Sequence, residues 1–166
     1  MSALKFHNAI MGEKIMKNSA VSTGPAQGIQ IDNSRKVTLV NNTIHDFVLY
    51  GLYAERSSNI VLENNILSGV RPELLPLANL TLLEFPFPTG GFELGNDTIT
   101  SFVIRNNTAS GTWNMGFRLH SKNCGDKNPA NQIEHNTAHS ISGFGVIVAT
   151  RVDTCQEFSK FYGYKN

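Results

Sequence analysis

The first residues of this sequence whose types and spacing suggest chemistry are two histidines four positions apart, His135 and His139. On a helix, such a pair lies on one face and can share a metal ion. The residues around them alternate as a strand does, and on an extended chain four residues span about 13 Å. We therefore expect no shared metal ion, and we expect His139 to hydrogen-bond the backbone beside a corner of the chain.

The candidate catalytic residues are Arg118, His120, His139 and Asp153. Polysaccharide lyases use a basic residue beside carboxylates or calcium, and most glycoside hydrolases use two carboxylates that flank the glycosidic bond. Neither set is complete here. Arg118, His120 and Asp153, together with Arg151, could line a glycan-binding groove, and a solvated outer face is the alternative. We expect no catalytic site, no metal site and no cofactor; if the chain is an enzyme, it is a polysaccharide lyase or a glycoside hydrolase.

Charge and hydropathy exclude several classes of protein. Fourteen Lys and Arg residues stand against 13 Asp and Glu residues, which leaves a net charge of +1, and the basic residues form no cluster. We therefore expect no nucleic-acid partner. No stretch has the ~20 apolar residues of a membrane span, and the start MSALKFHNAI lacks the pattern of a signal peptide. The sequence therefore predicts no membrane span within this chain.

The cysteines and the sequons bear on the cellular compartment. Cys124 and Cys155 have no CxxC motif or neighbouring His at ligand spacing, so the sequence predicts no zinc site and leaves one disulfide or two free thiols open. Four Asn-x-Thr triplets provide glycosylation candidates, which fits a secretory protein, although a chain rich in Asn and Thr produces such triplets by chance. The candidates are Asn41, Asn79, Asn96 and Asn106.

A repeat of 23 residues organises the first part of the chain. The segment VTLVNNTIHD at 37–46 returns as IVLENNILSG at 60–69, and further copies occur as FVIRNNTA at 102–109 and QIEHNTA at 132–138. A fainter copy is FHNAI at 6–10. A unit this short cannot bury its own apolar face, so we expect the copies to stack as the coils of a parallel β-solenoid.

Each copy follows a second alternating stretch that begins with glycine. These stretches are GIQI at 28, GLYA at 51, GFEL at 91, GFRL at 116 and GVIV at 145. The unit is therefore strand, turn, strand, Asn corner, short strand. We expect Gly and Asn at the corners because both tolerate left-handed backbone angles.

The second Asn of each corner predicts an internal ladder. Coils in register place Asn42, Asn65, Asn107 and Asn136 above one another, where each amide can bond its neighbours. The spacing from Asn65 to Asn107 exceeds one coil, so residues 70–91 are expected to form a loop insertion that packs on the solenoid or walls a binding groove. The predicted fold is all-β, a single-stranded right-handed parallel β-helix over residues 1–166.

The repeat resembles the right-handed parallel β-helix superfamily, the pectin-lyase-like fold of pectate lyases. The second half, with RNNTASGTWNMGFRL, HNTAHSISGFGVIV and CQEFSKFYGYKN, more specifically resembles the β-helix segment of the fibrocystin family, which includes related hyaluronan-processing proteins. The matching residues are Asn106, Asn107, Ala109, Gly111, Gly116, Phe117, Cys124, Asn136, Ala138, His139, Ser140, Gly143, Cys155, Phe158 and Phe161.

This resemblance implies an extracellular or cell-surface parent protein and a disulfide between Cys124 and Cys155. Since no signal peptide is recognised and the last residues have the pattern of another coil, we expect the sequence to be a fragment of a larger membrane or secreted protein. The expected function is a non-catalytic binding or structural scaffold whose partners are glycans or extracellular proteins. The alternative is a carbohydrate-active β-helix enzyme, either a polysaccharide lyase or a hyaluronan-degrading enzyme.

Overall fold

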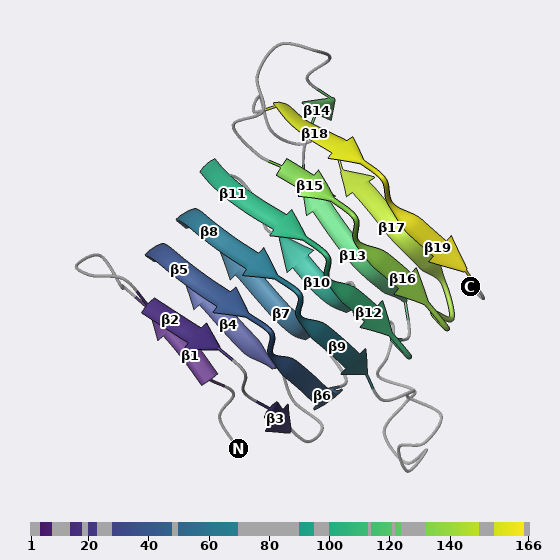
Figure 1. The fold of residues 1–166 in the computed structure, drawn as a ribbon, viewed down its shortest axis with the longest axis horizontal. Coiled ribbons are helices and arrows are strands. Elements are labelled where there is room, and N and C mark those ends of the chain that lie inside the picture. Colours follow the sequence, from purple (N-terminus) through teal and green to yellow (C-terminus); the bar gives the residue numbers. More distant parts are fainter. Residues whose placement is uncertain are drawn as a thin grey trace, which may run out of the picture.

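The computed structural model describes residues 4–7, 14–17, 20–22, 28–47, 50–69, 90–94, 100–112, 114–120, 122–123, 132–149 and 155–164. All regular structure in these ranges is β-strand (Figure 1). Every strand pair is parallel, and the strands form three sheets that run along the molecule. The predicted all-β parallel solenoid is therefore confirmed.

Except for one short strand, the chain visits the three sheets in turn, so that neighbours in a sheet belong to successive coils (Figure 1). Sheet 1 contains, in order, β1 (Leu4–His7), β4 (Ile29–Asp32), β7 (Tyr50–Glu55), β10 (Gly90–Leu94), β13 (Met115–His120) and β17 (Phe144–Ala149). Sheet 2 contains β2 (Lys14–Lys17), β5 (Arg35–Val40), β8 (Ser58–Glu63), β11 (Thr100–Arg105), β15 (Gln132–Glu134), β18 (Cys155–Ser159) and β14 (Lys122–Asn123). Sheet 3 contains β3 (Ala20–Ser22), β6 (Thr43–Phe47), β9 (Ile66–Gly69), β12 (Thr108–Ser110), β16 (Thr137–His139) and β19 (Tyr162–Tyr164). The exception is the two-residue strand β14, which precedes β15 in the chain but pairs with β18 at the end of sheet 2.

The register of the sheets follows the sequence repeat. In sheet 2, Val37 pairs with Ile60 and Ile60 with Phe102, as the aligned copies predict. The faint copy at 6–10 is placed wrongly, because Phe6 lies on β1 and pairs with Ile31 of sheet 1, not with a strand that precedes an Asn corner. The strand of that coil equivalent to VTLV is β2, which pairs with β5. The prediction was wrong because a five-residue alternation fits every strand of a solenoid equally well.

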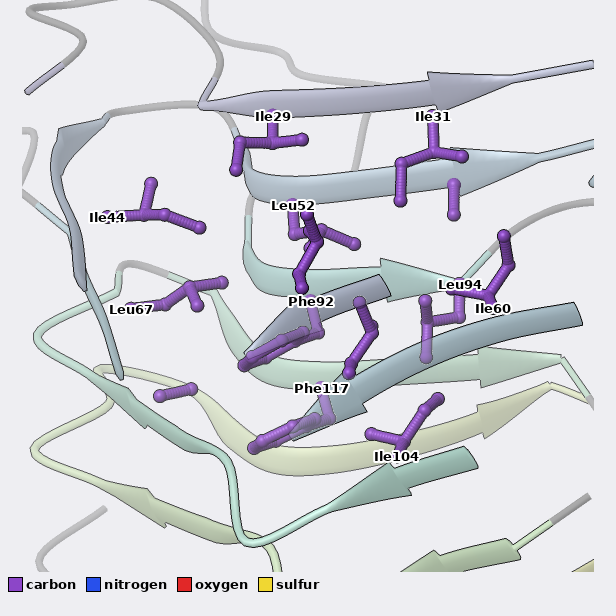
Figure 2. Close-up of a cluster of buried hydrophobic side chains, with 14 of the residues drawn as sticks. Ile29, Ile31, Ile44, Leu52, Ile60, Leu67, Phe92, Leu94, Ile104 and Phe117 are labelled. Carbon is purple, nitrogen blue, oxygen red and sulfur yellow. The ribbon is translucent and has the colours of Figure 1, made fainter. Parts of the chain in front are cut away.

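Alternate residues of all three sheets point inward and form one core. Figure 2 shows these side chains meeting between the sheets, with Phe92 and Phe117 one above the other. The two rings stack with centroids 4.5 Å apart and an interplanar angle of 4°. Burying a side chain of this size contributes about 1.5 to 3 kcal/mol. The labelled core residues are Ile29, Ile31, Ile44, Leu52, Ile60, Leu67, Phe92, Leu94, Ile104 and Phe117.

The glycines that open the sheet 1 stretches serve a different purpose from the predicted one. A positive φ is found among the described glycines at Gly111 but at none of the glycines that open these stretches. A Cβ at Gly116 would lie 2.7 Å from the carbonyl oxygen of Gly145 and 2.8 Å from the Cβ of Ala138. Gly28, Gly51, Gly91 and Gly116 are therefore required by close contacts with side chains of sheet 3, and three of them also by the backbone of the next strand in sheet 1, and not by a left-handed backbone.

The left-handed corner angles belong to the first residue of each Asn pair, as predicted for asparagine. Asn41, Asn64 and Asn106 have φ of 55°, 54° and 56°, and His135 takes the same position with φ 56°. The residue that follows turns its side chain inward. Asn42, Asn65, Asn107 and Asn136 are buried, with at most 1% of each exposed.

The buried asparagines form the predicted ladder. The Nδ2 group of Asn65 donates to Oδ1 of Asn107 at 3.0 Å and to the carbonyl oxygen of Leu39 at 2.9 Å. Its Oδ1 accepts from both the backbone N–H and the Nδ2 group of Asn42, each at 3.0 Å. The pattern continues from Asn107 to Asn136. Each amide thereby satisfies the polar groups of a corner that water does not reach.

The ladder ends at an aromatic residue. The register of β16 and β19 places Phe161 in the next coil at the position equivalent to Asn136. Its ring packs edge-on against the ring of Phe117, with centroids 5.0 Å apart. A second, shorter ladder joins Ser34 and Ser57 at the corner between sheets 1 and 2. The backbone N–H of Ser34 donates to Oγ of Ser57 at 3.0 Å. The two serines are 23 residues apart, one repeat, but we did not predict this contact.

The boundary of the predicted insertion changes slightly. Gly90 and Gly91 belong to β10, so the predicted loop at 70–91 extends two residues too far. The strand agrees with the glycine-led stretch GFEL that the repeat predicts from residue 91, and it begins one residue earlier. The rest of the insertion, at 70–89, lies outside the described residues.

Candidate functional site

The outer face of sheet 1 carries a row of side chains that contains Arg118, one of the predicted candidates. In each glycine-led stretch, the residue two positions after the glycine points outward, because its neighbours on both sides face the core. The register aligns these positions from coil to coil. The row consists of Gln30, Tyr53, Glu93, Arg118 and Ile147.

Glu93 and Arg118 form an ion pair between adjacent coils of this row. Nη1 of Arg118 lies 3.4 Å from Oε1 of Glu93. Although Glu93 lies on the outward row, it is only 4% exposed. A buried carboxylate requires a cation and hydrogen bonds, so the guanidinium group compensates a charge that would otherwise be costly.

A second group lies at the carboxyl ends of β4 and β7. Arg56 donates from Nε at 3.0 Å and from Nη2 at 2.7 Å to Oδ1 of Asp32, and Nη2 also donates to Oε1 of Glu55 at 3.3 Å. The hydroxyl group of Tyr53 donates to Oε2 of Glu55 at 3.0 Å. Four side chains from two coils are thus connected, and they hold Tyr53 beside Glu93 in the neighbouring strand.

Burial and these contacts shift the acid–base properties of the site. Burial raises the pKa of Tyr53, and the hydrogen bond to Glu55 raises it further because a carboxylate stabilises the neutral phenol. Burial also raises the pKa of Tyr50, with a contribution from Glu93 that Arg118 partly opposes. The pKa of Arg56 is raised, chiefly by its hydrogen bond to Asp32. Both tyrosines therefore remain neutral at physiological pH.

This arrangement defines what the face can do. Asp32, Glu55 and Glu93 are each engaged by a guanidinium group, and Arg118 is engaged by a carboxylate. An arginine that removes a proton from a sugar would have to leave its ion pair first. The phenol group of Tyr53 and the amide group of Gln30, by contrast, are suited to hydrogen bonding a polar ligand along the sheet.

The structure separates the predicted candidate residues. Arg118 lies on β13 of sheet 1, and the backbone of His120 continues that strand, where it pairs with Ala149. His139 lies on β16 of sheet 3 and is not brought to Arg118. Its Nδ1 lies 3.3 Å from Oγ of Ser140. We had expected a backbone partner, whereas the described partner is a side chain. Asp153 and the side chain of His120 lie outside the described residues, as does Arg151.

The remaining predicted sites are described only in part. Asn41 and Asn106 are exposed at the left-handed corner positions beside the ladder, whereas Asn79 and Asn96 lie outside the described residues. The backbone of Cys155 opens β18 and pairs with Lys122. Cys124 and the side chain of Cys155 lie outside the described residues, so their disulfide stays a prediction.

Sequence reasoning missed Asp32, Tyr53, Glu55, Arg56 and Glu93. A signal for two of them was present, because Tyr53 and Glu93 occupy the same place in their glycine-led stretches as Arg118. The connections made by Asp32 and Arg56 had no such signal, since they depend on how two strand ends of adjacent coils lie beside each other.

The described ranges contain neither a cluster of metal-binding side chains nor a membrane-spanning helix. No group of three or more His, Cys, Asp or Glu side chains in them is placed to hold a metal ion. In the same ranges, no helix is long and apolar enough to cross a membrane.

Comparison with known proteins identifies the family. Residues 3–124 match the family described as "Right handed beta helix region". No curated protein and no solved structure matches the chain. The matched segment contains five strands of sheet 1 and extends through the first three asparagines of the ladder. The chain belongs to the family of right-handed β-helix regions.

Proposed function

We propose that this β-helix region is a non-catalytic binding or structural scaffold, a segment of a larger fibrocystin-like protein that is secreted or displayed on the cell surface. Its partners would be glycans or extracellular proteins. The observation that carries the proposal is that the acidic groups on the outer face of sheet 1 are held by arginines and a tyrosine of the same face. Such contacts fix the shape of the face and engage the carboxylates that the structure describes there.

The interior supports the same role. A continuous ladder of buried amides and a column of core side chains connect coil to coil. A solenoid of this kind keeps its outer faces in a fixed geometry, because each coil is bonded to the next at every strand. The family-like motif that contains Asn106, Cys124 and Cys155 supports the extracellular setting.

The second candidate is a carbohydrate-active enzyme. The observation that favours it is the position of Glu55 and Glu93 on adjacent strands. Glu93 lies beside Tyr53, and Glu55 lies two residues farther along the strand of Tyr53. The strand spacing and the rise of two residues place their Cα atoms about 8 Å apart. An inverting glycosidase separates its two carboxyl groups by about 6.5 to 9.5 Å, and Cα atoms at this spacing allow two glutamate side chains to reach that separation. The contacts of both carboxylates with arginine and tyrosine weigh against this role.

Incubation with hyaluronan and with pectic polymers, with and without calcium, separates the two candidates. We expect chain lengths measured by gel filtration to stay unchanged. Shortened chains, together with loss of cleavage in Glu93→Gln and Arg118→Ala variants, would overturn the scaffold proposal. Shortened chains that persist in both variants would indicate a contaminating enzyme, which a preparation from a second expression host would identify.

The compartment is tested with the cysteines. A thiol reagent applied to the non-reduced, denatured protein from its native source should label neither Cys124 nor Cys155, because disulfides form in secretory compartments. Labelling of both cysteines would contradict an extracellular origin.

A further inference from the structure

A row of residues with a left-handed backbone runs along the edge of the solenoid between sheets 2 and 3. It contains the first residue of each Asn corner, and the register of sheet 2 places these residues one above another in successive coils. Their φ angles lie between 50° and 56°. We call this row the corner edge, which consists of Asn41, Asn64, Asn106, His135 and Lys160.

The corner edge holds its backbone firmly and leaves its asparagine side chains outside. The backbone N–H of Asn41 donates to the carbonyl oxygen of Glu63 at 3.0 Å, and that of Asn106 donates to the carbonyl oxygen of Glu134 at 3.2 Å. Both asparagines are exposed, and no hydrogen bond in the described part of the chain uses either side chain. Their amide groups are therefore available for modification in the folded protein.

The same two asparagines begin Asn-Asn-Thr triplets, and the fold gives each residue of a triplet its own direction. At the second triplet, Asn106 is exposed, Asn107 turns into the ladder, and Thr108 opens β12 with its side chain partly exposed. The triplet at 41–43 has the same arrangement at the start of β6. The amide of the first residue and the hydroxyl group of the third therefore lie outside the core, as an acceptor sequence for N-linked glycosylation requires.

The second asparagine of each pair is excluded as an acceptor. Nδ2 of Asn107 donates to the carbonyl oxygen of Leu62 at 2.9 Å and to Oδ1 of Asn136 at 3.1 Å. A sugar on that nitrogen would displace one of these hydrogen bonds and would have to lie inside the solenoid. A glycan is bulky and polar and belongs on the surface, so only the first asparagine of a pair is compatible with the fold.

We propose that Asn41 and Asn106 carry N-linked glycans. Nδ2 of the asparagine forms a bond to the anomeric carbon of an oligosaccharide, and the bond from that carbon to the pyrophosphate of a lipid-linked donor breaks. The lipid pyrophosphate leaves, and the amide gives up one proton to a base of the transferase. This inference rests on the proposed extracellular setting and names a modification of the chain in that setting.

The two glycans would occupy alternate coils of the corner edge. Asn64 lies between the two acceptors, and it is not an acceptor because Ile66 stands where the triplet needs a threonine. Since neighbouring strands lie about 4.8 Å apart, the two attachment points are about 10 Å apart. The glycans would project from the edge between sheets 2 and 3 and not from the outer face of sheet 1.

The test is expression of the full chain behind a cleavable signal peptide in a eukaryotic secretory host. Enzymatic release of the glycans in heavy-oxygen water converts each occupied Asn to a labelled Asp, which peptide mass spectrometry locates. We expect label at both Asn41 and Asn106. Thr43→Val should abolish the label at Asn41 alone and Thr108→Val at Asn106 alone, because each change removes one threonine of a triplet.

A gain of glycosylation tests the corner geometry. His135→Asn completes a triplet with Asn136 and Thr137 at the same corner position, where φ is 56°. Made together with Thr108→Val, so that the neighbouring coil carries no glycan, it should add label at position 135. The Thr43→Val and Thr108→Val double variant should unfold at the same urea midpoint as the glycosylated protein, because the acceptors point away from the core.

Several results would overturn the inference. These are absence of label at both acceptors, glycans confined to Asn79 and Asn96, or a clearly lower urea midpoint for the glycosylated protein; label at one acceptor alone would overturn the assignment of the other. The proposed function fails separately, by cleavage of a polymer or by labelling of both cysteines in the protein from its native source. The secretory host reports on the acceptors in either case, so the two failures are distinguishable.

Discussion

Replacing Asn65 with alanine tests the ladder that connects the coils. The side chain of Asn65 makes four hydrogen bonds, two through Oδ1 with Asn42 and two through Nδ2 with Leu39 and Asn107. A buried hydrogen bond contributes a net ~0.5 to 1.5 kcal/mol. The four together predict a loss of about 2 to 6 kcal/mol in the free energy of unfolding. That is a large share of the ~5 to 15 kcal/mol typical of a native domain.

The measurement is urea denaturation followed by far-UV circular dichroism, with the loss taken from the midpoint shift and the slope. Asn64→Gly is the matched control, because Asn64 is exposed at φ 54° and glycine adopts that angle without strain. We expect its effect to stay within about 0.5 kcal/mol. Asn136→Ala should cost less than Asn65→Ala, because it removes three hydrogen bonds where the ladder ends.

Two outcomes would refute this reasoning. The first is an Asn65→Ala protein whose free energy of unfolding is within about 0.5 kcal/mol of the unmodified chain, the range of an ordinary surface change. The second is an equal loss in Asn65→Ala and Asn64→Gly, because only the former side chain bonds the next coil.

Three further predictions concern packing and ionisation. Gly116→Ala should destabilise the protein by about 1 to 3 kcal/mol, since its Cβ would meet Ala138, and a neutral effect in chemical denaturation would contradict the close approach of the two sheets. Phe117→Ala should cost about 3 to 5 kcal/mol in the same assay, because it empties the centre of the core, and a loss below 1 kcal/mol would count against that position. Because the pKa of Tyr50 and of Tyr53 is raised above 10.0 in the folded chain, the unfolded chain releases these protons first. The free energy of unfolding should therefore fall as the pH rises past about 10, and less steeply in Tyr53→Phe; equal slopes would show that Tyr53 does not contribute.

The sequence by itself determined the coil and its register. Alternation with period two and the return of an Asn pair after 23 residues are local properties, and one unit cannot bury its face unless the next unit stacks on it. The ladder from Asn42 to Asn136 followed directly, because residues at the same place in each repeat must lie above one another.

Only the tertiary structure decided which outward residues meet. Asp32 and Arg56 come from different coils, and their contact depends on where two strands end. The separation of Arg118 from His139 has the same origin, because the three-sided path of each coil assigns one to sheet 1 and the other to sheet 3. The purpose of Gly116 was also hidden, since the space between two sheets is a property of side chains that are distant in sequence. A repeat fixes what lies above and below each residue, whereas contacts around a coil arise from the shape of the whole turn.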